Sequence, residues 1–353
     1  MEYRQLGRSG LRVSTLTLGT MGFGGTGWAS PVGQIGVEGA REQIALARDA
    51  GVNLIDTADI YSAGLSEEIL GEALGSERDD VLIATKCRMQ VGDRGGPNDM
   101  GLSRHHIIRS VEASLRRLKT DWIDLYQVHE WDGATPLEET LSALDDLVRS
   151  GKVRYVGCSN YGAWQVMKAA GISDREHLAR FASNQVYYSL QNRDIETEIV
   201  PAAIDQGLGI MVWSPLAGGL LSGKYRRGVE APAGSRHLSE WSEPPVNDEA
   251  KLYDTIEVAV QIGEAHGVSA AQVSLAWLLA QPAVTTLVVG ARTPVQLSDN
   301  LAAADLQLTA DEIKALDDVS GSPLSYPFWH QASNAADRLS DADRSLLGRH
   351  IDK

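Results

Sequence analysis

The sequence has few cysteines, no long apolar run and no excess of positive charge, and each absence excludes a class of protein. Its two cysteines among 353 residues, Cys87 and Cys158, provide neither a disulfide framework nor a four-cysteine zinc site. No run approaches the roughly 20 apolar residues that a membrane span needs, and the residues after Met1 lack the apolar segment of a signal peptide. We therefore expect a soluble, cytoplasmic protein.

Acidic residues outnumber basic ones, with 47 Asp and Glu against 32 Lys and Arg and a formal net charge of -15. Nucleic acids and anionic membrane surfaces bind basic faces, so neither is expected as a partner. A local basic pocket for one phosphate is still compatible with this balance. We expect a small-molecule partner, and the composition leaves a homo-oligomer open.

Short apolar, β-branched runs alternate with helical patterns along most of the chain. The strand-like runs are residues 16–18, 53–55, 81–85, 123–128, 153–158, 181–186, 209–213 and 286–289. The helical patterns include residues 39–50, 66–74, 103–118, 137–150, 195–206 and 251–279, the last broken at Gly267. This alternation indicates a parallel sheet that is buried on both faces. Eight strand-helix units are the number that closes an α/β barrel, the (β/α)8 or TIM barrel.

We expect one barrel domain over residues 1–353, because no linker-like stretch separates the units. Residues 1–14 have the alternation and turn glycines of a hairpin, which would close one end. Residues 21–37 and 214–247 are too long for ordinary connections and are interpreted as functional loops. Residues 321–353 form a tail after a terminal helix. We expect both loops and the tail to lie on the working face.

Chemically active residue types follow the strand-like runs, and loops at the C-terminal ends of parallel strands carry the chemistry of barrel enzymes. One run ends at Asp56, Tyr61 follows in a small-residue turn, and Ser66 is in position to cap the next helix. Lys86 and His129 end the next two runs, and a buried Lys86 would need Asp56 as its partner. Each residue alone has an ordinary structural explanation, but together they predict a site.

These residues lie in motifs that make the chain resemble the aldo-keto reductases over roughly residues 3–318. The motifs are Leu18-Gly19-Thr20-Met21, Asn53-Leu54-Ile55-Asp56-Thr57-Ala58 followed by Tyr61, Ala84-Thr85-Lys86, Tyr126-Gln127-Val128-His129, Gly157-Cys158-Ser159-Asn160, Asn184-Gln185-Val186, Trp213-Ser214-Pro215-Leu216 and Gly290-Ala291-Arg292-Thr293. The long loop resembles that of bacterial aldo/keto reductases and potassium-channel beta subunits. The resemblance implies a (β/α)8 barrel with a catalytic tetrad of Asp56, Tyr61, Lys86 and His129.

The reaction that the resemblance implies is reduction of an aldehyde or ketone, or the reverse oxidation of an alcohol, with hydride from a nicotinamide. In this scheme Tyr61 donates the proton. A phenol normally titrates near pH 10, and the ammonium of Lys86 is expected to favour the phenolate. Asp56 would keep Lys86 charged, and a neutral His129 would orient the carbonyl. No metal is required.

The resemblance also implies a site for NADP(H), preferred over NAD(H). Trp213 would stack on the nicotinamide, and Thr293 would cap a helix whose free N–H groups, with Arg292 beside them, suit the 2′-phosphate. The residues expected to contact the cofactor are Gly19, Thr20, Met21, Asp56, Ser159, Asn160, Gln185, Trp213, Ser214, Pro215, Leu216, Gly218, Lys224, Arg236, Gly290, Arg292, Thr293, Gln296, Asp299 and Asn300.

Aromatic residues near the expected mouth are candidates for substrate contact. They are Phe23 and Trp28 in the first long loop, Trp131 beside His129, and Trp329 in the tail. An aromatic cluster in a tail is unusual at the surface of a monomer. It fits a lid over the pocket and a subunit contact equally well.

Three other functions fit parts of this pattern. With Lys86 as a Schiff-base nucleophile the barrel would be an aldolase, but the spacing of Tyr61 and the cofactor residues argue against it. A metal-dependent hydrolase is disfavoured because no paired histidines accompany His129 and Asp56. The third is a redox-responsive NADP-binding module like the channel beta subunits. Those subunits depart from the usual histidine, so His129 favours an enzyme.

Overall fold

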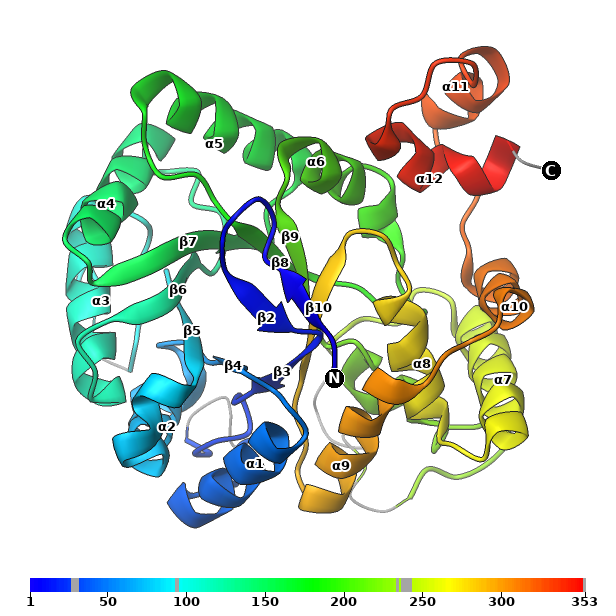
Figure 1. Cartoon of the computed structure of the whole chain (residues 1–353), viewed down its shortest axis with the longest axis horizontal. Coiled ribbons are helices and arrows are strands. Elements are labelled where there is room, and N and C mark those ends of the chain that lie inside the picture. Colours follow the sequence, from blue (N-terminus) through cyan, green and yellow to red (C-terminus); the bar gives the residue numbers. More distant parts are fainter. Residues whose placement is uncertain (27–31, 93–94, 233–234, 236–242, 352–353) are drawn as a thin grey trace.

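The computed structural model describes residues 1–26, 32–92, 95–232, 235 and 243–351. In this described part, eight parallel strands form a closed barrel, in the order β10, β3, β4, β5, β6, β7, β8 and β9 around the ring (Figure 1). The strands are β3 (Leu16–Gly19), β4 (Leu54–Asp56), β5 (Leu82–Cys87), β6 (Ile123–Val128), β7 (Val153–Ser159), β8 (Ser183–Tyr187), β9 (Gly209–Trp213) and β10 (Val284–Val289). The predicted (β/α)8 barrel is confirmed.

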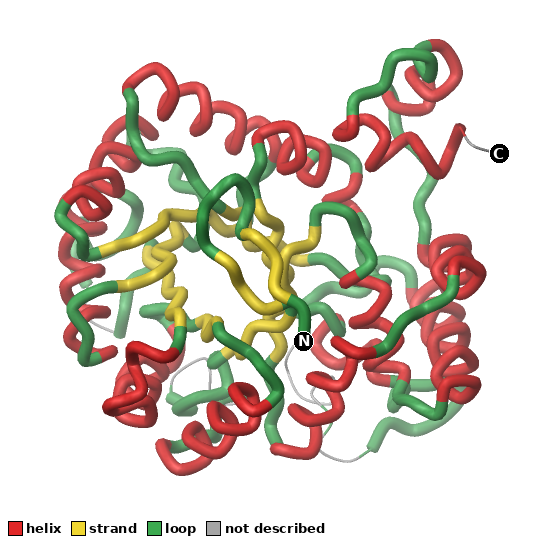
Figure 2. The backbone as a smooth tube through the Cα atoms, in the orientation of Figure 1, coloured by secondary structure: helices red, strands yellow, loops and turns green. Residues whose placement is uncertain are grey.

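Helices surround the barrel, as the red segments around the yellow strands show in Figure 2. They are α1 (Val37–Asp49), α2 (Leu65–Leu74), α3 (Arg104–Leu118), α4 (Leu137–Arg149), α5 (Ala163–Glu176), α6 (Ile199–Gln206), α7 (Glu249–His266), α8 (Ala270–Leu279), α9 (Pro294–Ala302) and α10 (Ala310–Ser320). The sequence pattern did not predict α5, in which Gly171 lowers helix propensity. None of the helices described here is long and apolar enough to span a membrane.

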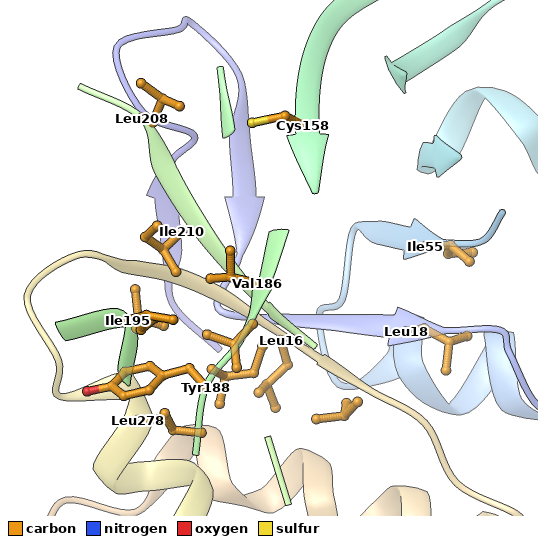
Figure 3. Close-up of a cluster of buried hydrophobic side chains, with 14 of the residues drawn as sticks. Leu16, Leu18, Ile55, Cys158, Val186, Tyr188, Ile195, Leu208, Ile210 and Leu278 are labelled. Carbon is orange, nitrogen blue, oxygen red and sulfur yellow. The ribbon is translucent and has the colours of Figure 1, made fainter. Parts of the chain in front are cut away.

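Apolar side chains of the strands divide between the interior of the barrel and the layer under the helices. In β6, Tyr126 and Val128 belong to the large outer cluster, whereas Leu125 belongs to the inner one. Figure 3 shows part of the outer cluster, with Leu16, Leu18, Ile55, Val186 and Ile210 among its labelled members. Because both layers are apolar, polar side chains buried inside the barrel are candidates for a functional role.

The N-terminal hairpin closes one end of the barrel, as the sequence predicted. Its strands, β1 (Tyr3–Gln5) and β2 (Arg12–Ser14), pair antiparallel. Leu6 and Val13 have no solvent exposure and pack inside the barrel with residues near the start of the strands, such as Leu54. The hairpin therefore covers the N-terminal ends of the strands and leaves the C-terminal ends for the site.

The C-terminal tail does not lie on the working face, and that prediction is wrong. Its helices, α11 (Phe328–Asn334) and α12 (Asp341–Ile351), lie outside the barrel, and α12 packs against α6 (Figure 1). Arg349 of α12 contacts Glu196 at 3.3 Å and Asp317 at 3.5 Å. These ion pairs, which the sequence pattern could not reveal, hold the tail at the side of the barrel.

We expect that replacing Gly7 with alanine destabilises the protein, because the hairpin is seated too closely for a side chain there. Gly7 has φ +57°, and an added Cβ would lie 2.5 Å from the carbonyl oxygens of Ala182 and Gly207. The expected loss is about 1–3 kcal/mol in the free energy of unfolding, measured by urea titration. Gly10→Ala is the control, because its Cβ would meet the Tyr155 hydroxyl at 3.7 Å. Equal stability of the two variants would contradict this account.

Candidate active site

A cavity of about 830 Å³ opens at the C-terminal ends of the strands. This volume is typical of a site for a cofactor or small ligand. The predicted site residues that line it are Gly19, Thr20, Met21, Asp56, Tyr61, His129, Ser159, Asn160, Gln185, Trp213, Ser214, Pro215, Leu216, Gly218, Lys224, Gly290, Arg292, Gln296, Asp299 and Asn300. The fold thus brings residues from distant parts of the chain to one concave surface.

Lys86 does not line this cavity itself; it is fully buried inside the barrel, in contact with Asp56 and Tyr61, which do line it. Its Nζ donates hydrogen bonds to Asp56 Oδ2 at 2.6 Å, to the carbonyl oxygen of Thr57 at 2.8 Å and to the Tyr61 hydroxyl at 3.3 Å. Three acceptors are what an ammonium can use, so the charge is satisfied without water. The arrangement fixes the ammonium directly beside the phenol.

Asp56 is held by side-chain amides from two further strands. Its Oδ1 accepts hydrogen bonds from Gln185 Nε2 at 2.8 Å and Gln127 Nε2 at 3.3 Å. Gln185 was predicted as a cofactor contact, and in the structure it also orients the carboxylate. Gln127 was missed as a site residue. Its signal was available, because Gln127 lies on β6 two residues before His129, which directly follows that strand, and alternate residues of an extended chain point to the same side.

The turn that carries Tyr61 has an unusual backbone. Ser62 and Ala63 have φ values of 51° and 57°, which are uncommon for residues other than glycine. The Ser62 hydroxyl accepts a hydrogen bond from the Gly25 N–H at 2.9 Å and donates one to the Phe23 carbonyl at 3.1 Å. The first long loop therefore braces the turn and fixes the direction of the Tyr61 side chain.

Ser66 does not cap the helix that follows, and that interpretation is wrong. The N-cap residue of α2 is Gly64, with φ 97°. The Ser66 hydroxyl instead donates to the carbonyl oxygen of Thr20 at 2.9 Å. Ser66 therefore ties α2 to the end of β3 beneath the cavity floor.

Burial and neighbouring charges have opposing effects on the pKa values of Lys86 and Tyr61. Burial by itself lowers the pKa of Lys86, but the charge of Asp56 and the hydrogen bonds that Lys86 makes to Asp56 and Tyr61 outweigh it and leave that pKa raised. Burial raises the pKa of Tyr61; the charge of Lys86 lowers it but does not prevail. Lys86 therefore favours the phenolate, as expected, but the effect of burial on the pKa of Tyr61 is larger. Tyr61 is a protonated phenol, and Lys86 is an ammonium.

His129 follows β6, and its ring lies next to that of Tyr61. The two ring centroids lie 6.0 Å apart, with the ring planes at 76°. Burial, reinforced by the charges of Lys86 and Arg88, holds the pKa of His129 well below its ordinary value. The imidazole is therefore neutral, and its Nδ1 is buried with no hydrogen-bond partner in the described structure. A phenol and a neutral imidazole thus share one face of the cavity.

The wall beside these groups is made of amides and an indole. Trp213 Nε1 donates to Asn160 Oδ1 at 2.9 Å, and Tyr187 packs against the Trp213 ring with centroids 5.0 Å apart. Asn160 has φ 57°, and Ser159 donates to the Gln185 carbonyl at 2.9 Å. A flat aromatic face next to fixed amide groups suits a planar ring that carries a carboxamide.

The far end of the cavity is positively charged. Thr293 caps α9 by accepting a hydrogen bond from the Gln296 N–H at 3.3 Å, and Pro294 occupies the first turn, as the sequence predicted. Thr293 itself does not line the cavity, whereas the exposed Arg292 does. Lys224 lies close to Gly219, which has φ +97° and whose added Cβ would lie 3.6 Å from its Nζ. A helix N-terminus with two nearby cations suits phosphate groups.

Asp299 is already engaged within the protein. Its Oδ2 accepts from the Ser269 hydroxyl at 2.7 Å, and its Oδ1 accepts from Gln272 Nε2 at 2.6 Å. Asp299 lines the cavity but uses both carboxylate oxygens to tie α9 to the start of α8. A direct contact to adenine or ribose would have to compete with these bonds.

The candidate substrate aromatics that lie in the described part of the chain, Phe23, Trp131 and Trp329, do not line the cavity. Phe23 has no solvent exposure and packs against Ala40 and Ile69. Trp131 packs edge-on against Tyr161 and Trp164, each at 5.3 Å. The structure therefore assigns Phe23 and Trp131 to packing, because their loops turn the rings toward neighbouring side chains.

Trp329 lies on α11 in the tail, is 51 % exposed and is absent from the cavity lining. A lid formed by this residue is therefore not seen, since the tail is held at the side of the barrel. Trp28 and Arg236 lie outside the described residues.

Several cavity residues were not predicted. Ile60, Met89, Glu130, Ser222 and Glu243 all line it. Glu130 is half-buried and its Oε1 accepts from Asn160 Nδ2 at 2.8 Å. Burial raises the pKa of Glu130, while the Asn160 hydrogen bond and the charge of Arg88 oppose the shift. Its position directly after His129 at a strand end was a usable signal. Glu243 follows no strand and gave none.

Comparison with known proteins agrees with this geometry. The family described as "Aldo/keto reductase family" matches residues 15–320. The chain is 40% identical over 332 residues to "Uncharacterized oxidoreductase YrpG" of Bacillus subtilis (strain 168), covering 92% of this chain and 97% of that protein. It is 37% identical over 314 residues to "Probable voltage-gated potassium channel subunit beta" of Arabidopsis thaliana, covering 87% of this chain and 92% of that protein.

A fungal enzyme is similarly related. The chain is 36% identical over 342 residues to "Versiconal hemiacetal acetate reductase" of Aspergillus parasiticus, covering 90% of this chain and 96% of that protein. The family match spans the whole barrel, and these relatives align along nearly all of their own length. The chain belongs to the aldo/keto reductase family and is an oxidoreductase of that family.

Proposed function

We propose that the protein is an NADPH-dependent reductase that converts an aldehyde or ketone to an alcohol, or carries out the reverse oxidation. The observation that carries the proposal is the contact of Lys86 Nζ with both Asp56 and the Tyr61 hydroxyl, at 2.6 and 3.3 Å, at the floor of the cavity. It provides a proton donor and a fixed positive charge where a carbonyl oxygen would gain negative charge. Relatives named as an oxidoreductase and a reductase support the same reaction class.

Each member of the tetrad has one task in this reaction. A nicotinamide cofactor supplies the hydride when bound. Tyr61 donates its proton to the carbonyl oxygen, and Lys86 stabilises the phenolate that remains. Asp56 keeps Lys86 charged and aimed at the hydroxyl. The neutral His129 donates a hydrogen bond that orients the carbonyl, which it can do without competing for the proton.

The donor set of the cavity fits a nicotinamide dinucleotide phosphate. Trp213 offers a ring face beside Asn160, with which it shares a hydrogen bond of 2.9 Å. Arg292 and Lys224 line the other end, next to the N-terminus of α9. An arginine at such a helix end recognises a phosphate and adds affinity for NADP(H) over NAD(H).

The aldolase alternative is disfavoured by the protonation of Lys86. A Schiff-base lysine must lose its proton to attack a carbonyl, and the charge of Asp56 opposes that loss. A metal-dependent hydrolase lacks support, since the described residues contain no group of three or more His, Cys, Asp or Glu side chains suited to hold a metal.

A regulatory NADP-binding module is the second candidate, favoured by the 37% identity to a protein named as a probable potassium channel subunit beta. The two functions differ in turnover. An enzyme with excess carbonyl oxidises many equivalents of NADPH per chain, whereas a regulatory module gives one equivalent and then stops.

We expect Tyr61→Phe to lower kcat for carbonyl reduction by about 10²- to 10⁴-fold, because the variant loses its proton donor. Cofactor binding, measured by fluorescence titration, should be kept. The control is Tyr326→Phe, which removes a hydroxyl from a tyrosine that is 74% exposed in the tail. Unchanged kcat in Tyr61→Phe would rule out the proposed acid.

The pH dependence of carbonyl reduction should be flat through neutral pH. The raised pKa of Tyr61 keeps the phenol protonated below its ordinary value of about 10, and the lowered pKa of His129 keeps the imidazole neutral above about 6.5. We therefore expect kcat/KM for reduction to fall only as pH rises through the alkaline range. Alcohol oxidation, which needs the phenolate, should rise there. An inflection of reduction near pH 7 would be inconsistent with these protonation states.

Arg292→Ala should weaken NADPH binding by about 10- to 100-fold, because the variant loses a charge-assisted contact to the 2′-phosphate. NADH lacks that phosphate and serves as the internal control, so its dissociation constant should change little. Both constants are measured by quenching of tryptophan fluorescence. An equal loss for the two cofactors would show that Arg292 does not read the phosphate.

A further inference from the structure

Glu130 is a carboxylate in the reacting end of the cavity that the tetrad does not use. It follows His129 in the chain, is half-buried and lines the cavity. Its Oε1 accepts one hydrogen bond, from Asn160 Nδ2 at 2.8 Å. Within the described structure its Oε2 accepts none, so this oxygen can accept one from a ligand in the cavity.

The charge of Glu130 is not neutralised by an ion pair. Among the described residues no cation lies within 4.0 Å of its carboxylate. The charge of Arg88 lowers the pKa of Glu130, but the Arg88 side chain donates to the Trp131 carbonyl at 3.4 Å, and within the described structure its Nε is buried without a partner. Lys86 is committed to Asp56. Glu130 therefore presents negative charge to the cavity.

A second carboxylate lies at the same cavity. Glu243 also lines the cavity, and its charge acts on both Glu130 and Tyr61. The cations that line the cavity, Arg292 and Lys224, belong to the end formed by α9 and the loop after β9. Asp299 on α9 adds one carboxylate to that end, so the described lining carries two cations and one anion there, whereas Glu130 lies at the end where the carbonyl is proposed to be reduced.

We propose that Glu130 determines substrate specificity by favouring carbonyl compounds that carry a positive charge or a hydrogen-bond donor and by rejecting those that carry a carboxylate. This inference rests on the proposed reductase function and adds the substrate class. A donor or cation on the substrate meets Oε2, whereas a carboxylate meets a like charge in a partly desolvated site. Like charges brought together in this way lower affinity by about tenfold or more.

The test uses NADPH and three aldehydes of nearly the same shape. They are benzaldehyde, 4-carboxybenzaldehyde and 4-(trimethylammonio)benzaldehyde. For the unmodified enzyme we expect kcat/KM to be at least about tenfold higher for the cationic than for the anionic aldehyde. The intrinsic reactivity of each aldehyde cancels when the same ratio is compared between enzyme variants.

Glu130→Gln removes the charge and keeps an oxygen that can accept from Asn160. We expect the ratio of cationic to anionic kcat/KM to fall by about tenfold in this variant. The control is Glu42→Gln, an exposed position on α1 that changes the net charge equally. If Glu130 only positioned Asn160, Glu130→Gln would leave the ratio unchanged, and that result would overturn the inference.

A binding measurement separates this inference from the proposed function. The corresponding benzyl alcohols are titrated into the enzyme with NADP+ present, and tryptophan fluorescence gives their dissociation constants. The same preference for the cationic ligand, lost in Glu130→Gln, would support the inference even where no aldehyde is reduced. Absence of reduction would then count against the proposed function alone. Equal binding of both charged alcohols would overturn the inference.

Discussion

The buried pair of Lys86 and Asp56 is the interaction on which the site depends. Each isolated charge would cost several kcal/mol to bury, and an ion pair offsets that cost only if its remaining hydrogen-bonding atoms are satisfied. The barrel meets this condition, since Lys86 Nζ also reaches the Thr57 carbonyl at 2.8 Å and Asp56 accepts from Gln185 at 2.8 Å. The polar layer at the C-terminal end of the strands is therefore arranged around one charge pair, while the apolar layers provide stability.

The turn after β4 carries Tyr61 and places its hydroxyl beside Lys86. Ser62 and Ala63 have left-handed backbone conformations, each costing about 1–3 kcal/mol for a residue with a side chain. Hydrogen bonds from this turn to Gly25 and Phe23 hold it in place. This explains the burial of Phe23, whose ring anchors the loop that braces Tyr61. Phe23, which was expected to contact the substrate, thus supports the turn that carries Tyr61 instead.

The strands, and the meeting of Asp56, Tyr61, Lys86 and His129 at one end of them, could be predicted because parallel strands in a barrel are continuous apolar runs whose C-terminal ends meet. The predictions that were wrong concern the directions of side chains and contacts between distant residues, which a local sequence pattern does not contain. An aromatic in a loop, such as Trp131, gives no sign of whether its ring faces a cavity or a neighbouring helix. The sequence indicated that Lys86 lies beside Tyr61, but it did not indicate that burial would raise the pKa of Tyr61. The position of the tail depends on ion pairs of Arg349 with residues far away in the sequence.

The difference in charge between the two ends of the cavity would favour one orientation of a bound dinucleotide. The chain as a whole has a net charge of -15, whereas one end of the cavity is lined by two cations, Arg292 and Lys224. Under the proposed function, Arg292 and Lys224 provide favourable charge for phosphates among the described cavity residues, and the carboxylate of Glu130 repels them from the other end. The same field that selects the substrate would then also reject the reversed orientation of the cofactor. If both proposals hold, substrate choice and cofactor orientation would each depend on the carboxylate of Glu130.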